Sequence, residues 1–294
     1  MPKFLPRVFA ALALLLVPAA HAQEVQDADP ALWVVKDADT TIYLFGTVHI
    51  LRPGLSWFDD GVKQAFDASG EVVLEMLEPE GPAAQALMLG AAMSSDGRKL
   101  SDRIPEDKRE AFLAGLAQAH VAPALLDPYD PWFASVNLTI ATLMAHGFDP
   151  ASGAEPTITA AAKAAGKRLV GFETMEEQLG FFERLSEQAQ VAMLLSTLAE
   201  LPGLDATIGK MVADWSRGDA DAIAAMLNEN LVDSPETMKT LLTDRNARWA
   251  DRIADWMKQP GTIFIAVGAG HLAGTNSVQA YLAGHDLHAE RVQY

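Results

Sequence analysis

Two turns of the form Gly-x-x-His are the places where this chain could do chemistry. Gly46-Thr47-Val48-His49 follows the apolar run 41–45, and Gly268-Ala269-Gly270-His271 follows the apolar run 262–267. Glycines such as Gly46, Gly268 and Gly270 let a chain leave a strand sharply, through positive φ or close backbone approach. Two neutral imidazoles with one or two carboxylates would form a ligand set for a divalent ion, with a position open for water.

Two glutamates occupy comparable positions after other apolar runs. Glu75 follows Val72-Val73-Leu74, and Glu173 follows the run 168–172. Open α/β sheets bind ligands at the carboxyl ends of their strands, so these residues could converge with the two histidines on one site.

The chemistry of such a site is hydrolysis by metal-bound water, which loses a proton easily and becomes a nucleophile. A carboxylate acts as general base when its pKa lies between the free value of ~4.3 and neutrality. We predict Glu75 as that base, His49 and His271 as metal ligands, and Glu173 as a second candidate for either role.

Structural explanations compete with this interpretation. A single histidine at a strand end is commonly a hydrogen-bonded structural residue, and Glu173 precedes a helix N-terminus where an acid is favourable in any case. The occurrence of all four residues at strand ends favours a shared site. The other histidines of the mature chain are expected to be structural or exposed: His120, His146, His285 and His288.

Two neighbouring residues are candidates for support of the site or contact with substrate. Asn246 lies on the same helical face as Leu242, Trp249 and Ile253, so its amide needs hydrogen-bond partners within an apolar stripe and could orient a site group. Arg245 could bind an anionic substrate group, with an ordinary ion pair as the alternative.

The pattern of elements predicts an α/β fold with a mostly parallel central sheet and helical layers. Runs 32–36 and 41–45 flank a polar turn and predict a hairpin. Residues 81–147, punctuated by prolines, predict three helices inserted between strands, and 175–259 is again helical. A capping box at Thr174 starts this second helical region, and a strand from about 287 to 292 closes the chain.

The first 22 residues predict a secretory signal. Lys3 and Arg7 provide the positive start, an apolar run follows, and Ala20-His21-Ala22 is a cleavage site, so the mature chain begins near Gln23. That run is too short for a bilayer of roughly 30 Å, and no later stretch reaches about 18 apolar residues. We therefore predict an exported, periplasmic protein without a membrane span in its mature chain.

Charge and length narrow the class of protein. The chain of 294 residues has 22 basic and 39 acidic residues, and removal of Lys3 and Arg7 leaves 20 against 39, a net charge of −19. Nucleic acid is therefore not expected as a partner. The chain has no cysteine, so any metal must be held by His, Asp or Glu. Residues 23–294 are predicted to form a single domain.

Five segments together resemble the TraB/GumN family over nearly the whole mature chain. They are Leu44-Phe45-Gly46-Thr47-Val48-His49, Val73-Leu74-Glu75, the run 171–179, Arg245-Asn246 with Trp249, and Val267-Gly268-Ala269-Gly270-His271-Leu272. The resemblance implies an erythromycin esterase/ChaN-like fold. Through similarity to the Tiki proteases, it also implies a metalloprotease-like site of two Gly-x-x-His motifs and an essential glutamate.

The family positions match His49, His271 and Glu75, with Glu173 a further candidate. One departure concerns a Gly-x-Asp that the family often has before the helix leading to the third strand. This chain has Gly153-Ala154-Glu155 there, which leaves the role of Glu155 open.

These observations predict an exported metal-dependent hydrolase, peptidase-like, acting on a peptide or small molecule. Imidazole and carboxylate suit several divalent ions, so Mn²⁺, Co²⁺ and Zn²⁺ are all candidates. The alternatives are a non-catalytic protein that binds haem through one of the histidines, or a factor that sequesters a peptide or assists polysaccharide export.

Overall fold

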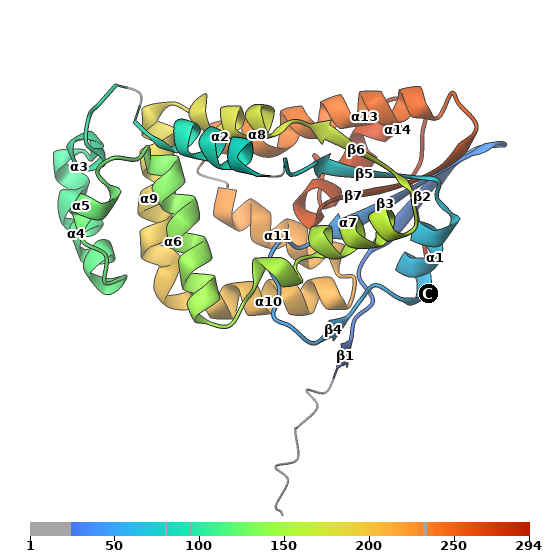
Figure 1. The fold of residues 1–294 in the computed structure, drawn as a ribbon, viewed down its shortest axis with the longest axis horizontal. Coiled ribbons are helices and arrows are strands. Elements are labelled where there is room, and N and C mark those ends of the chain that lie inside the picture. Colours follow the sequence, from blue (N-terminus) through green and yellow to red (C-terminus); the bar gives the residue numbers. More distant parts are fainter. Residues whose placement is uncertain (1–24, 80, 95, 232–233) are drawn as a thin grey trace, which may run out of the picture.

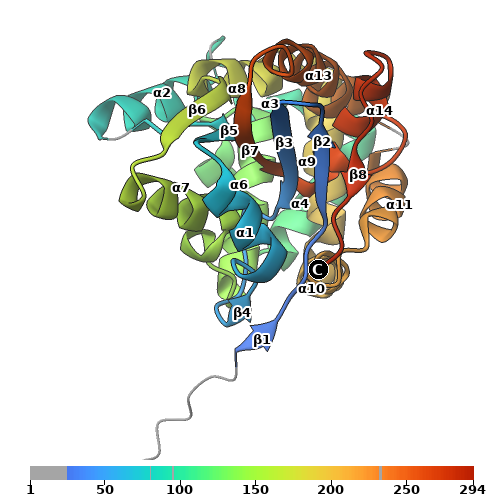
Figure 2. The same ribbon diagram turned by 90° about the vertical axis from the view of Figure 1, so that its right-hand side faces the viewer.

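The computed structural model describes residues 25–294 except 80, 95, 232 and 233, and the predicted signal sequence lies outside the described residues. Within the described part, a six-stranded sheet has the order β6-β5-β7-β3-β2-β8, which can be followed in Figure 2. Its strands are β2 (Leu32–Lys36), β3 (Thr40–Thr47), β5 (Glu71–Met76), β6 (Arg168–Glu173), β7 (Gly261–Gly268) and β8 (Glu290–Arg291). Two short strands, β1 (Gln26–Asp27) and β4 (Leu55–Ser56), pair separately.

The sheet is mixed, so the prediction of a mostly parallel sheet was wrong. Strands β3, β7, β5 and β6 run parallel, but β2 pairs antiparallel with both β3 and β8. The predicted hairpin is confirmed, because a short polar turn can only join antiparallel strands. The closing strand is confined to Glu290–Arg291, shorter than predicted.

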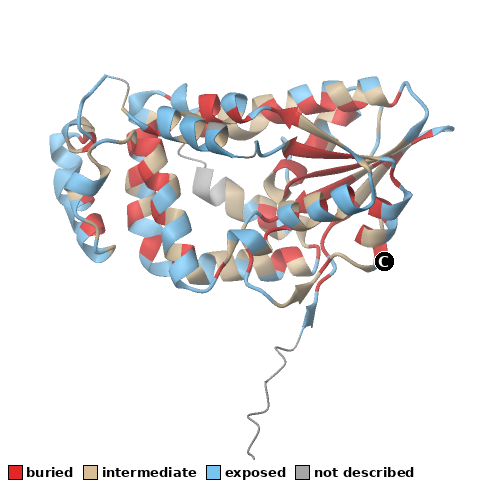
Figure 3. Cartoon of the chain, viewed as in Figure 1, coloured by how far each residue is buried: buried red, intermediate tan, exposed pale blue. Residues whose placement is uncertain are grey.

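Helices cover both faces of the sheet, because its strands are apolar on both sides. In β7, Phe264 and Ala266 pack into one core, and Ile265 and Val267 pack into the other. Figure 3 shows the resulting buried strands at the centre of the sheet. The first core is covered by α1 (Asp60–Ala68), α7 (Ala154–Ala164), α10 (Leu204–Ser216) and α11 (Ala220–Leu231), and the second by α13 (Asp244–Trp256) and α14 (Val278–Ala283).

A helical half extends from the end of the sheet (Figure 1). It contains α2 (Pro82–Ala92), α3 (Leu100–Arg103), α4 (Arg109–Gln118), α5 (Pro123–Leu126), α6 (Pro131–Ala145), α8 (Met175–Glu183), α9 (Glu187–Glu200) and α12 (Pro235–Met238). The described part of 81–147 thus forms five α-helices and not the predicted three. The prolines explain the division, since Pro82, Pro123 and Pro131 each stand in the first turn of a helix.

One helical segment bears on the predicted absence of a membrane span. Within the described residues, Glu187–Ser216 is long and apolar enough to cross a membrane, a test that the core helices of soluble proteins also pass. A turn at Leu201–Gly203 divides it, and Figure 1 shows α9 and α10 running in different directions. The absence of a membrane span stays a prediction.

Candidate active site

The parallel register of the sheet brings the two Gly-x-x-His turns together. β3 and β7 are neighbours, with Thr47 opposite Gly268, and β5 lies on the other side of β7. His49 and His271 therefore follow adjacent strands, and Glu75 extends from the next strand along. Glu173 ends β6, where it pairs with Met76. The structure thus gathers at one edge the four residues that the sequence singled out.

Gly268 lies between the three central side chains. Its N–H donates to Glu75 Oε1 at 2.7 Å. A β-carbon on Gly268 would lie 3.1 Å from Glu75 Oε1, 3.4 Å from His49 Nε2 and 3.7 Å from His271 Cδ2. Its φ of −48° is open to any residue, so glycine is needed here for close approach and not for positive φ.

His271 is buried, and its hydrogen bonds determine where its proton lies. Asn246 Nδ2 donates to the carbonyl of Asn276 at 2.7 Å, so Asn246 Oδ1 must accept from His271 Nδ1, 2.5 Å away. The lone pair of His271 is consequently on Nε2, which lies 3.6 Å from Glu75 Oε1. Burial lowers the pKa of His271 to about 4, against the opposing effect of Glu75, so the ring is neutral at pH 7.

His49 is paired with an acid and lies open to solvent, with a side chain 67% exposed. Its Nδ1 lies 2.7 Å from Glu155 Oε1, which also accepts from Thr47 Oγ1 at 2.5 Å. Neighbouring protein atoms desolvate the ring and lower its pKa, but the charge and hydrogen bond of Glu155 outweigh this and raise the pKa of His49 to about 9.

Glu155 is a site residue whose role sequence reasoning left open. It stands in the first helical turn of α7. The start of this helix packs against the Gly-x-x-His turn that ends at His49. Ala154 N–H donates to the Val48 carbonyl at 3.1 Å, and a β-carbon on Gly153 would lie 2.2 Å from the His49 carbonyl oxygen. The departure from Gly-x-Asp was the one sequence signal of this contact.

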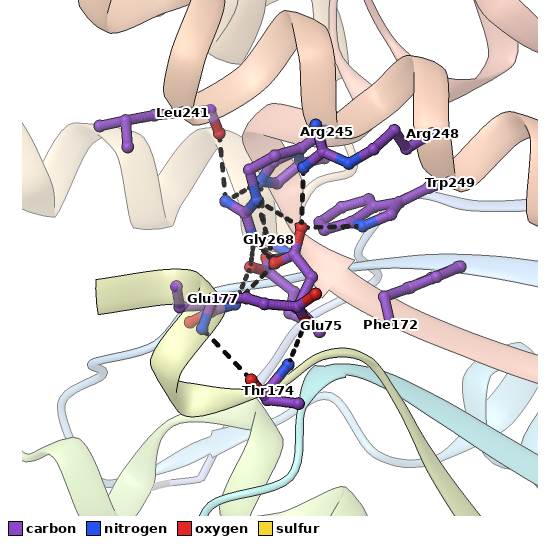
Figure 4. Close-up of polar contacts among 12 residues, drawn as sticks. Glu75, Phe172, Thr174, Glu177, Leu241, Arg245, Arg248, Trp249 and Gly268 are labelled. Atoms are coloured by element: carbon purple, nitrogen blue, oxygen red, sulfur yellow. Dashed lines mark hydrogen bonds and ion pairs between the residues drawn. The ribbon is translucent and has the colours of Figure 1, made fainter. Parts of the chain in front are cut away.

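Arg245 is the cation at the centre of the site (Figure 4). Its Nη2 donates to Glu75 Oε2 at 2.6 Å and to Glu173 Oε2 at 2.7 Å. Nη1 donates to the Leu241 carbonyl at 3.1 Å, in the π-helical turn Lys239–Thr243 that leads into α13, and lies 3.2 Å from His271 Nε2. In this structure Arg245 therefore makes a buried ion pair with both glutamates.

Glu173 is fully engaged by donors. Besides Arg245, it accepts from Trp249 Nε1 at 3.1 Å and from Gln178 Nε2 at 3.2 Å. The predicted capping box is confirmed directly after it, with reciprocal hydrogen bonds between Thr174 and Glu177. These contacts make Glu173 an anchor for Arg245.

Glu75 does not have the pKa expected of a general base. Burial raises its pKa, but His271, Arg245, His49 and the Gly268 N–H together lower it to about 2. Because His271 is neutral at pH 7, Arg245 and His49 provide the positive charge there. This pKa lies below the range from ~4.3 to neutrality that we expected, and Glu75 is ionised at neutral pH. Its assignment as the general base stays a prediction.

The imidazole and carboxylate groups at this edge are of the kinds that bind divalent ions, but in this structure they are not close enough together to form a complete ligand set. Both rings have Nδ1 held by an acceptor, an arrangement that orients histidine ligands in metal sites, and this leaves Nε2 of His49 near Gly268 and Nε2 of His271 near Glu75. Among the described residues, no three His, Asp or Glu side chains are already close enough to hold a metal together. Arg245 Nη1 lies 3.2 Å from His271 Nε2, so it occupies the lone pair that a metal would need.

The remaining histidines lie outside this site and are exposed: His120, His146, His285 and His288. Two of them pair with surface acids, His146 with Asp205 at 3.5 Å and His285 with Asp251 at 3.0 Å. This agrees with the expectation from sequence.

The fold and the site define an α/β protein with a polar, histidine-containing centre at the carboxyl edge of its sheet. The model of the TraB/PrgY/gumN family matches residues 31–291, and the chain belongs to this family. It is 20% identical to an uncharacterized protein of Treponema pallidum (strain Nichols) over 269 residues, covering 84% of this chain and 78% of that one. No solved structure matches the chain.

Proposed function

We propose that this protein is a metal-dependent hydrolase, peptidase-like, in which His49, His271 and Glu75 bind a divalent ion at the carboxyl edge of the sheet. The observation that carries the proposal is the matched orientation of the two imidazoles. Each has Nδ1 engaged by its own acceptor, Glu155 or Asn246. His49 Nε2 lies 3.4 Å from the place of a β-carbon on Gly268, and His271 Nε2 lies 3.6 Å from Glu75 Oε1.

A bound divalent ion would supply a nucleophile by lowering the pKa of its water to about 7. The chain's own residues prepare the site for this. Glu75 offers Oε1 as an anionic ligand, because its Oε2 is held by Arg245 and its pKa of about 2 keeps it ionised. Glu173 holds Arg245, whose buried guanidinium can stabilise negative charge developing on a substrate oxygen.

Metal analysis with hydrolysis assays tests the proposal. Purified mature protein is loaded with Mn²⁺, Co²⁺ or Zn²⁺, dialysed, analysed for bound metal, and incubated with a peptide library. We expect the wild type to retain metal and cleave peptides, and His49→Ala and His271→Ala to lose both properties. The matched control is His285→Ala, which removes an exposed histidine that lies outside the site and pairs with Asp251.

The double variant gives the decisive result. Peptide cleavage undiminished in the protein carrying both His49→Ala and His271→Ala would falsify the proposed site. Metal retention without turnover of any peptide would instead favour a binding protein.

Export belongs to the same proposal, and it rests on the sequence of residues 1–22. Expression of the full chain in a Gram-negative host, with fractionation and N-terminal sequencing of the product, tests it. We expect the mature protein in the periplasm, beginning at Gln23. Recovery of the uncleaved chain in the cytoplasm would contradict it.

A further inference from the structure

We infer that Glu155 is a positioning residue that fixes both the orientation and the tautomer of His49. The inference deepens the proposed function, because it says how an exposed histidine is kept ready to bind. Glu155 Oε1 accepts from His49 Nδ1 at 2.7 Å, which leaves the Nε2 lone pair of the neutral ring toward Gly268 and Glu75.

Glu155 is itself anchored to the sheet. Its Oε1 also accepts from Thr47 Oγ1 at 2.5 Å, and Thr47 is a buried residue at the end of β3. The start of α7 is joined to the same segment by the hydrogen bond from Ala154 N–H to the Val48 carbonyl. The acceptor of His49 is therefore attached at two points to the turn that carries His49.

His49 needs such a partner more than His271 does. Its side chain is 67% exposed, and Glu155 is its hydrogen-bond partner in the described part of the chain. His271 is packed against Trp249, with ring centroids 4.4 Å apart, and is held by Asn246. An exposed imidazole without a partner rotates freely and favours the tautomer with its proton on Nε2, which leaves no lone pair on Nε2 for a metal.

The second oxygen of Glu155 supports a functional reason for this acid. Oε2 is buried and has no hydrogen-bond partner among the described residues. An unpaired buried oxygen is unfavourable, so a purely structural residue at this position would be better satisfied by an apolar side chain. A carboxylate here serves the two groups on Oε1, which are Thr47 and His49.

Tautomers measured by long-range ¹H–¹⁵N NMR on the metal-free protein test the inference. At a pH high enough for the imidazole of His49 to be neutral, the wild type is expected to carry the His49 proton on Nδ1, where it meets Glu155. Glu155→Ala should shift the proton mainly to Nε2. Glu155→Asp keeps a carboxylate and should retain more of the Nδ1 form than Glu155→Ala.

His271 is the internal control, because its acceptor Asn246 is unchanged and its tautomer should be the same in all three proteins. The inference is overturned if His49 keeps its proton on Nδ1 in Glu155→Ala. Should Glu155→Ala fail to fold, Glu155→Asp decides the question. A larger Nε2-protonated population of His49 than in the wild type, with His271 unchanged, supports the inference. A wild-type distribution of the His49 tautomers in a folded Thr47→Val, Glu155→Asp protein overturns it.

Metal affinity gives a second readout. Co²⁺ titration followed by absorbance should show binding about 10–100-fold weaker in Glu155→Ala, the usual effect of removing a partner of a histidine ligand. Asp205→Ala, which removes the acid paired with exposed His146, should leave Co²⁺ binding unchanged. A tautomer shift without Co²⁺ binding by any of these proteins would keep the positioning role and reject the metal site.

Discussion

The two Gly-x-x-His turns share a pattern and a sheet, yet their histidines have opposite electrostatics. His49 is exposed and paired with a carboxylate, and its pKa is raised to about 9. His271 is buried and paired with an amide, and its pKa is lowered to about 4. The motif thus determines where each ring lies, while the residue on Nδ1 and the degree of burial determine its charge.

This difference has a consequence for ligand binding at neutral pH. His271 offers a lone pair without change, whereas His49 must first lose a proton. We therefore expect divalent metal to bind more tightly as pH rises toward 9, with proton release from the first turn.

The largest expected effect on stability comes from breaking the ion pairs beside the second turn. Arg245→Met leaves Glu75 and Glu173 buried without their shared cation, so we expect a loss of about 3–5 kcal/mol in the free energy of unfolding. Glu155→Gln at the first turn should cost only about 0–1 kcal/mol, because His49 is exposed. Urea unfolding measures both, and equal losses would contradict the contrast between the turns.

A second prediction concerns the packing of α7 on the first turn. Gly153→Ala places a β-carbon 2.2 Å from the His49 carbonyl oxygen, so the start of α7 must move away. We expect a loss of about 1–3 kcal/mol in thermal unfolding, as for other overpacked sites. Gly209→Ala is the matched control: its β-carbon meets nothing within 4 Å, and alanine in α10 should be neutral or stabilising. If Gly153→Ala left the stability unchanged, α7 would not be packed tightly against this turn.

Replacing Asn246, the hydrogen-bond acceptor of His271, tests whether the acceptor on Nδ1 sets the pKa of the ring. Asn246→Asp gives His271 a carboxylate, as His49 has, so the pKa of His271 should rise from about 4 toward or above its ordinary value of about 6.5. NMR titration of the ring measures it. A pKa that stays near 4 would mean that burial alone controls His271.

The smallest expected effect is the loss of stability at alkaline pH that comes from His49. The raised pKa of His49 contributes stability that is complete below pH 6.5 and lost as the pH rises through about 9, reduced by its exposure to solvent. The lowered pKa of Glu75 acts oppositely, with stability present above pH 4.5 and lost as the pH falls toward about 2. Denaturant unfolding across this range should show both declines, and Glu155→Gln should abolish the alkaline one alone.

Much of the candidate site could be predicted from sequence because its residues follow strands with strong local signals. The apolar runs before His49, Glu75 and His271 all form strands, and Asn246 contacts His271 as its place in an apolar stripe suggested. Parallel pairing of those strands then brings their ends together without further information.

The features that sequence did not predict depend on contacts between distant segments. The direction of β8 is set by its pairing with β2, which no local pattern specifies. The low pKa of Glu75 depends on Arg245, 170 positions away, and the role of Glu155 depends on the docking of α7 against β3. The sequence pattern also did not separate short helices such as α3 and α5 from their neighbours, because each has only four residues.

The pairing of Thr47 with Gly268 means that the backbone of the sheet sets the distance between the two Gly-x-x-His turns. Adjacent strands are held about 4.8 Å apart by their hydrogen bonds, so the spacing between the bases of the turns does not depend on any side chain. Insertions or substitutions in the helical half would therefore alter what approaches the edge of the sheet while leaving the separation of the two turns intact. Such a division lets the helical half diverge while the spacing of the two turns stays unchanged.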